Sequence, residues 1–350
     1  MHDSTVVTVA SPSGQTFAAI LEHLQTDSQQ YFGTPWARCD VLATHDRPYS
    51  SVVRLVAHTP EGDRTLYAKT FKPRNDTPAE LERQRQYLST EYERTRLATQ
   101  AFASMPHLGV PRLIAWFPDL MAIVTEEAQG IGFDGILKRL ALTRTRGARE
   151  TAMTALQRVG EWLRVFQSRI PADPLQRKDH RRYLERRLQA LTRLGAIAQD
   201  DSDRLLASFD DQWARISYEE LNPVATHADL CPANILVARD RVTVIDLAAS
   251  LDRAKYLDVA HLYMHLTLAG RRLHLGRGLT EQLRQTLLQS FEPGLRTDLP
   301  LFRLMLLQNV AVYYLFLVQS QPAGLRQRLL HGRQLRYARD WMFDFAGVPA

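Results

Sequence analysis

The sequence is poor in cysteine and in long apolar runs. Its 350 residues include only two cysteines, Cys39 and Cys231. This number excludes a disulfide-rich secreted scaffold and fits a reducing cytoplasm. Residues 1–14 have no basic segment and no long apolar segment, so we expect no secretory signal. The most apolar stretch, residues 304–318, is interrupted by a polar Gln-Asn pair and is too short to span a bilayer comfortably. We expect a cytoplasmic protein with a buried C-terminal helix and no transmembrane segment. A peripheral membrane contact stays open.

Lysine is scarce as well, with five lysines among 44 basic residues. The arginine excess reflects either genomic base composition or the affinity of arginine for phosphate groups. Residues 251–350 hold thirteen basic residues against seven acidic ones, which accounts for the whole formal charge of +6. No recognised nucleic-acid-binding motif accompanies this basic region, so we do not expect nucleic acid as a partner.

The residue pattern changes along the chain from strand-like to helical. A length of 350 residues suits two lobes that share a cleft. A charged helix is expected over 78–102, and the chain after residue 128 is mostly helical. The pattern predicts an α+β protein with a β-rich part (1–128) and a larger helical part (129–350). The strands expected in the first part are 41–44, 51–58 and 64–71.

The most informative motif is THADLCPANILV (226–237), followed by the strand-like VTVID (242–246). It sets His227, Asp229 and Asn234 in an H-x-D-L-x-x-x-N frame and places Asp246 after an apolar run. This spacing is typical of catalytic loops that transfer phosphoryl groups.

The motif residues have side chains suited to this chemistry. The Asp229 carboxylate can accept the proton of a hydroxyl group and orient its oxygen. Asn234 and Asp246 offer the oxygen ligands that Mg²⁺ prefers. We expect His227 to support the loop by hydrogen bonding. Asp258 is either a further support of the loop or an ordinary helix cap.

A lysine is expected to contact the nucleotide phosphates from the first part of the chain. Lys69 is the candidate because it lies on a strand between apolar neighbours, and Lys72 is the alternative. A carboxylate from the 78–102 helix should hold it. Glu91 is slightly preferred over Glu93, and the choice stays open.

Glycine is absent where a phosphate-covering loop would normally contain it. HDRPYSS (45–51) joins two expected strands, and Ser50 and Ser51 offer hydroxyl and backbone N–H groups there; a plain hairpin is the alternative. The turn after the strand at 120–126 places backbone groups of Glu126 and Ala128 where an adenine edge would lie.

With these residues placed, the chain from about Val41 to Tyr263 resembles the aminoglycoside phosphotransferase and choline kinase group. The resemblance implies a bilobal protein-kinase-like fold and use of ATP or GTP with Mg²⁺. It also implies a catalytic base at Asp229, metal ligands at Asn234 and Asp246, and a phosphate contact at Lys69. The positions that match the group are His227, Asp229, Asn234, Asp246 and Asp258. Alanine occupies positions 228 and 233, where glycine is usual in the group, and Cys231 stands where a second histidine is common.

The expected activity is phosphorylation of a hydroxyl on a small molecule or sugar. The depletion of carboxylates in 251–350, with Arg253 and Lys255 shortly after Asp246, favours a neutral or anionic acceptor over a cationic one. The competing view is that a few acidic residues such as Asp252 still form a pocket that binds a cationic acceptor. A lipopolysaccharide or glycolipid sugar kinase is the main alternative. A protein kinase is disfavoured because no A-P-E motif follows Asp246. A pseudokinase is disfavoured because the catalytic residues are all present.

Overall fold

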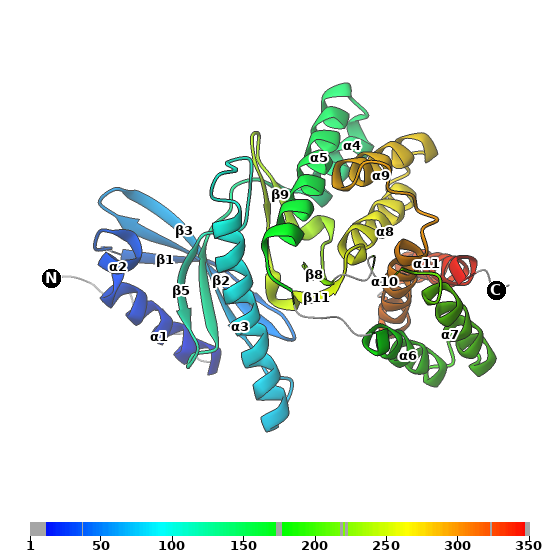
Figure 1. Cartoon of the computed structure of the whole chain (residues 1–350). Helices are drawn as coiled ribbons and strands as arrows, with labels where there is room; N and C mark the ends of the chain where they lie inside the picture. The colour runs from blue at the N-terminus through cyan, green and yellow to red at the C-terminus, as the bar shows by residue number, and fades with distance from the viewer. Residues whose placement is uncertain are drawn as a thin grey trace. The chain divides into compact units, whose positions relative to one another are not determined.

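The computed structural model describes residues 12–36, 38–172, 177–217, 220, 223–322 and 324–346. Its chain forms two compact units (Figure 1). The first unit comprises Met1–Gly130 and Ala238–Ser250, and the second unit comprises Ile131–Val237 and Leu251–Ala350. The expected boundary at residue 128 lies two residues from the observed one. Residues 238–250, which the sequence analysis assigned to the second part, belong to the first unit.

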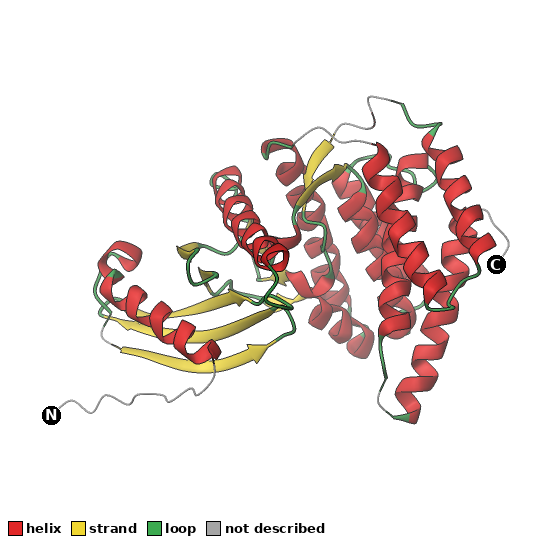
Figure 2. Cartoon of the chain, turned by 90° about the horizontal axis from the view of Figure 1, so that it is seen from below, coloured by secondary structure: helices red, strands yellow, loops and turns green. Residues whose placement is uncertain are grey.

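The first unit is built on a five-stranded antiparallel sheet with the order β1-β2-β3-β6-β5 (Figures 1 and 2). The strands expected at 41–44, 51–58 and 64–71 all lie within longer observed strands. The chain reverses between β2 and β3 at a tight turn, where Gly62 has a φ of 124° that favours glycine. The five strands are β1 (Arg38–Asp46), β2 (Ser50–Thr59), β3 (Gly62–Phe71), β5 (Leu113–Phe117) and β6 (Ala122–Glu126).

Helices cover the two faces of this sheet. On one face lie α1 (Pro12–Thr26) and α2 (Ser28–Phe32). Ile20 and Leu24 of α1 and Phe32 of α2 share a core cluster with Leu66 and other sheet residues. On the other face, Leu88 of α3 (Pro78–Ala101) packs with residues of β3 and β6.

Residues 238–250 join the first unit through two contacts. Strand β10 (Val242–Val244) pairs in parallel with β4 (Leu108–Gly109). The short 3₁₀ helix η3 (Leu247–Ala249) then packs on α3. Asp246 lies between these two anchored elements, which fixes its backbone against the first unit.

The second unit is mostly helical and contains two short strand pairs. Strand β7 (Ile131–Gly132) pairs with β9 (Ile235–Val237), and β8 (Pro223–Thr226) pairs with β11 (Leu251–Ala254). The 3₁₀ helix η2 (Pro232–Asn234) directly precedes β9. The helices are α4 (Phe133–Thr143), α5 (Arg146–Arg169), α6 (Arg177–Arg193), α7 (Gln199–Trp213), α8 (Leu257–Arg272), α9 (Arg277–Phe291), α10 (Pro300–Gln319) and α11 (Leu325–Ala346).

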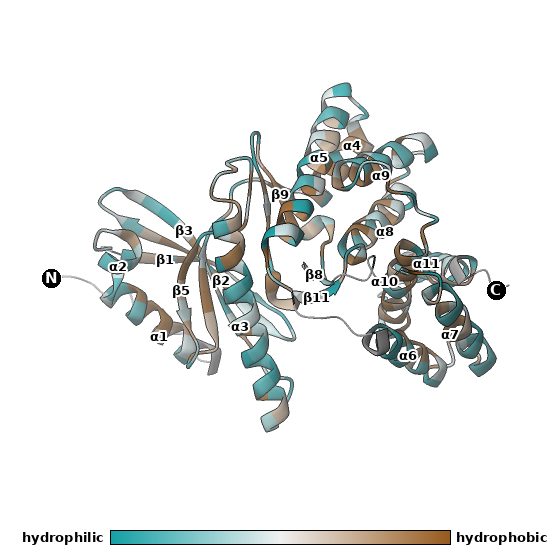
Figure 3. Ribbon diagram, viewed as in Figure 1, coloured by the Kyte–Doolittle hydropathy of each residue, from teal (hydrophilic) through white to brown (hydrophobic). Residues whose placement is uncertain are grey.

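Helix α10 is the apolar C-terminal helix expected from the sequence (Figure 3). Among the described residues it is the one helix long and apolar enough to cross a membrane, and 67% of its most apolar window is buried inside the protein. It packs against α6, α7, α8 and α11. These contacts make α10 a core helix of the second unit.

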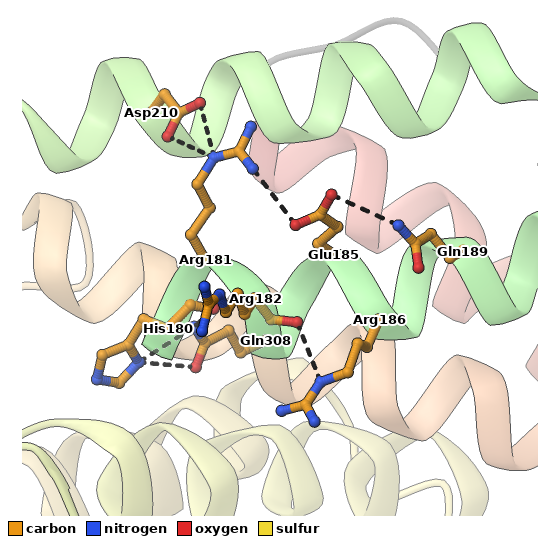
Figure 4. A network of polar contacts seen from close by, with 8 residues as sticks. All are labelled: His180, Arg181, Arg182, Glu185, Arg186, Gln189, Asp210 and Gln308. Carbon is orange, nitrogen blue, oxygen red and sulfur yellow. Dashed lines mark hydrogen bonds and ion pairs between the residues drawn. The ribbon is translucent and has the colours of Figure 1, made fainter. Parts of the chain in front are cut away.

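Polar contacts attach α6 to its neighbours (Figure 4). The Arg181 guanidinium donates to the carboxylate of Asp210 on α7 at 3.1 Å. The buried His180 lies 3.3 Å from the amide oxygen of Gln308 on α10. Because buried polar groups need partners, these contacts specify how α6 docks on the bundle.

Candidate active site

Lys69 lies at the centre of a buried ionic cluster in the first unit. Its Nζ atom is 2.8 Å from a carboxylate oxygen of Glu91 on α3 and 2.7 Å from a carboxylate oxygen of Asp246. The exposed fractions of the side chains are 17% for Lys69, 10% for Glu91 and 35% for Asp246. The structure therefore brings together three residues that are 22 and 177 positions apart in the chain.

The cluster keeps Lys69 charged although it is buried. Burial acts to lower the pKa of Lys69, but attraction to Glu91 and Asp246 outweighs it and raises that pKa above its ordinary value. Burial raises the pKa of Glu91. The positive charge of Lys69 opposes this increase, and the negative charge of Asp246 adds to it. A charged ammonium held between two oxygens is a suitable group for phosphate binding.

Helix packing distinguishes Glu91 from Glu93. Glu91 is buried on the sheet side of α3, whereas Glu93 is exposed and pairs with Arg96 one turn further along the same helix. Lys72, the alternative lysine, pairs with the exposed Asp46 at the end of β1.

The segment from Asp229 to Asn234 forms a tight loop in the second unit. Asp229 is exposed, and its carbonyl accepts hydrogen bonds from the backbone N–H of Cys231 at 2.9 Å and from the Asn234 side-chain amide at 3.0 Å. The same amide lies 3.2 Å from the Asp229 carboxylate. The Asp229 N–H donates to the Nδ1 atom of buried His227 at 3.2 Å. These bonds hold the backbone of the loop, and Asp229 remains exposed.

Asp258 supports the start of this loop. Its two carboxylate oxygens accept the backbone N–H groups of His227 and Ala228, each at 2.8 Å. Burial raises the pKa of Asp258 to about 7, although the two backbone hydrogen bonds oppose the shift and the charge of Asp229 adds to it. Ala228 has a φ of 63°, in the left-handed region that favours glycine. Its backbone conformation is the one for which glycine is suited, although the residue is alanine.

The remaining expected nucleotide contacts lie in different settings. Ser50 and Ser51 belong to β2 rather than to the turn before it, and Ser51 is buried. The turn itself is closed by the Arg47 N–H donating to the carbonyl of Ser50 at 2.8 Å. Glu126 and Ala128 line a cavity of about 440 Å³ within the first unit. The N–H of Glu126 donates to the carbonyl of Arg112 and is therefore already used. Contacts of these four residues with a nucleotide stay predictions.

The two expected Mg²⁺ ligands belong to different units, Asp246 to the first and Asn234 to the second. Within the described part of the chain, no three His, Cys, Asp or Glu side chains cluster as a metal site. Mg²⁺ commonly uses only one or two protein oxygens together with phosphate and water. The Asn234 amide nitrogen is occupied by Asp229, which leaves its oxygen as the group suited to a cation. Asp246 keeps an exposed fraction of 35%.

A basic cavity in the second unit was not predicted from the sequence. This cavity has a volume of about 630 Å³, and residues 231–233 of the catalytic loop form part of its wall. Arg271, Arg272 and Arg333 line it. The available sequence signal was helical spacing, because the lining residues of α8 and of α11 each lie on one face of their helix. They are residues 265, 268, 269 and 272 of α8 and residues 330, 333, 334 and 337 of α11. Lys255, one of the two cations expected to favour an anionic acceptor, is paired with Glu292 at 2.6 Å.

One family model matches most of the chain. The model of the phosphotransferase enzyme family, APH, matches residues 53–301. No curated protein matches the chain.

Solved structures share the fold at low sequence identity. The complex of aminoglycoside phosphotransferase APH(2″)-IIa with streptomycin and ATP has 13% identity and a TM-score of 0.54, covering 96% of this chain and 99% of that chain. The choline kinase LicA of Streptococcus pneumoniae has 10% identity and a TM-score of 0.54, with coverages of 93% and 99%. A choline/ethanolamine kinase family protein of Mesorhizobium loti has 13% identity and a TM-score of 0.56, with coverages of 93% and 97%. The expected α+β kinase-like fold is confirmed.

Proposed function

The chain belongs to the phosphotransferase enzyme family and is a phosphotransferase that acts on hydroxyl groups, and from this premise we propose its substrates and catalytic residues. The proposed reaction moves the γ-phosphoryl group of ATP or GTP to a hydroxyl of a small molecule or sugar. The observation that carries the proposal is the pair of hydrogen-bonded constellations, Lys69 with Glu91 and Asp246 in the first unit and Asp229 with Asn234 in the second.

Asp229 is the proposed catalytic base. Its exposed carboxylate accepts the proton of the acceptor hydroxyl as the oxygen bonds to the γ-phosphorus and the bond from that phosphorus to the bridging oxygen breaks. Asn234 holds this carboxylate through its side-chain amide. Asp258 and His227 hold the loop backbone and act as positioning residues.

Lys69 is the proposed phosphate-binding residue, and Glu91 keeps its ammonium in place. Asn234 and Asp246 are the residues that would hold Mg²⁺. When bound, this ion neutralises charge on the nucleotide phosphates. Ser50, Ser51, Glu126 and Ala128 remain proposed nucleotide contacts.

The acceptor is proposed to be neutral or anionic, such as a sugar or a sugar phosphate, and a glycolipid sugar is the alternative within the same reaction. The positive charge of residues 251–350 supports this choice. The low number of cysteines fits a reducing cytoplasm, where we place the enzyme.

Replacing Asp229 tests the proposed chemistry. Asp229→Ala should lower turnover by about 10²-fold or more, because the proton acceptor is lost. Nucleotide affinity should change little, since this carboxylate is not a proposed phosphate ligand. Nucleotide consumption against neutral, anionic and cationic acceptors gives the rate, and titration with a fluorescent nucleotide gives the affinity.

A matched control is Asp211→Ala, which removes an exposed carboxylate of α7 in the same unit. It should behave like the wild-type enzyme. Near-wild-type turnover of Asp229→Ala on the best acceptor would refute the assignment.

A further inference from the structure

The basic cavity of the second unit adjoins the catalytic loop. Cys231, Pro232 and Ala233, which line it, are three of the four residues between Asp229 and Asn234. Helices α4, α8 and α11 supply most of the other lining residues. A volume of about 630 Å³ is large enough for a small-molecule ligand.

The charges that line this cavity are mostly of one sign. Lys138, Arg271, Arg272 and Arg333 are cationic, and Asp134 is the one lining carboxylate. Asp134 is itself paired with Lys138 at 2.7 Å. The three arginines therefore carry the unbalanced charge of the cavity.

These arginines have no acidic partner among the residues that the structure describes. Salt bridges elsewhere in the second unit join arginine to a carboxylate, as between Arg181 and Asp210, but none involves Arg271, Arg272 or Arg333. Arg271 is instead stacked over the ring of Tyr337, 3.6 Å from its centroid. Stacking fixes the guanidinium plane while leaving its N–H groups available for a ligand.

The histidine that faces Arg272 does not add to this charge. His265 lines the cavity, and burial lowers its pKa to about 4, with the nearby Arg272 contributing to the shift. The ring is therefore neutral near pH 7. The unbalanced charge named above comes from the three arginines, which stay charged at all physiological pH values.

We propose that this cavity is the acceptor site and that Arg272 and Arg333, with Arg271, bind a phosphate or carboxylate group of the acceptor. The proposal rests on the proposed function, because it supplies the substrate class of the same site. Arginine binds such groups through paired N–H donors. A cationic acceptor would meet like charges in the cavity and no unpaired lining carboxylate to bind it.

A chemical probe can test anion binding without any turnover. Cys231 lines the cavity and is partly exposed. Burial, with a smaller contribution from the charge of Asp40, raises the pKa of the Cys39 thiol to about 12. Iodoacetamide should therefore alkylate Cys231 faster than Cys39. The alkylation rate of each cysteine is measured by peptide mass spectrometry with glucose 6-phosphate, glucose, glucosamine or inorganic phosphate present.

The expected result is protection of Cys231 by glucose 6-phosphate, with inorganic phosphate weaker and glucosamine inactive. Arg272→Gln and Arg333→Gln should each weaken protection on the order of 10-fold or more, because each removes charge-assisted hydrogen bonds. The control Arg336→Gln removes an exposed arginine of α11 that does not line the cavity, and should keep protection unchanged.

Several outcomes would overturn the proposal. They are absence of protection by both phosphates, equal protection by glucosamine, and equal loss in Arg336→Gln. Loss of protection in Lys69→Met, under conditions where hydrogen exchange shows the second unit to be folded, would do so as well, because it would assign the anion to the proposed nucleotide site. If protection behaves as expected but Asp229→Ala keeps full turnover, the catalytic assignment fails and the anion site stands.

Discussion

Replacing Lys69 by methionine perturbs the ionic cluster of the first unit most directly. The substitution keeps the side-chain length and removes the ammonium that contacts both Glu91 and Asp246. Glu91 is then left with only 10% of its side chain exposed and without the cation that neutralised it.

The expected loss of stability follows from this burial. Removing one partner of a buried ion pair costs about 3–5 kcal/mol when the other partner stays charged. Burial already raises the pKa of Glu91, and loss of Lys69 raises it further, so protonation relieves part of the penalty. An acid whose pKa is raised by folding contributes stability that is present below its unfolded pKa and is lost as the pH rises through its folded pKa. The deficit of Lys69→Met should therefore grow from acid to neutral pH.

Urea unfolding at several pH values measures this deficit, and hydrogen exchange of peptides from β3 and α3 locates it. Glu91→Leu in the Lys69→Met background should restore part of the stability by removing the buried carboxylate, but not nucleotide binding. Lys72→Met is the control, because its ion pair with Asp46 is exposed and should matter little. A deficit no larger than that of Lys72→Met, or one independent of pH, would refute the reasoning.

The remaining predictions concern the metal and the catalytic loop. Asp246→Asn should weaken Mg²⁺-dependent nucleotide binding and turnover together, and an unchanged Mg²⁺ dependence of the rate would count against Asp246 as a metal ligand. Asp258 has a folded pKa of about 7 and an ordinary pKa of 3.8, a difference that corresponds to about 4 kcal/mol. This stability is present below pH 3.8 and is lost as the pH rises through 7. Asp258→Asn should remove this slope from urea unfolding measured between pH 4 and 8; parallel curves for variant and wild type would contradict it. Ala228→Gly should raise the free energy of unfolding by about 0.5–1 kcal/mol. The reason is that relief of the left-handed strain in the folded state exceeds the entropy that glycine adds to the unfolded chain. A loss of stability in the same assay would show that the strain is absent.

The sequence alone indicated the elements and residues that depend on local order. Alternation of residue types predicted the three first strands, and the charged pattern predicted the helix over 78–102, because these signals arise within a single element. The fixed spacing of His227, Asp229 and Asn234 indicated phosphoryl transfer for the same reason, since one short loop contains all three.

Tertiary structure decided the features that join distant parts of the chain. Glu91 and Glu93 are two residues apart, and the sequence favoured Glu91 only slightly; folding buries Glu91 against the sheet, where it contacts Lys69. Residues 238–250 belong to the first unit because β10 pairs with β4, a contact between segments more than 130 residues apart. The cations of the basic cavity come from three helices, and each looks like an ordinary surface residue until packing brings their helix faces together. Sequence patterns within one element cannot specify these arrangements, because helix and strand faces acquire partners only when the whole chain folds.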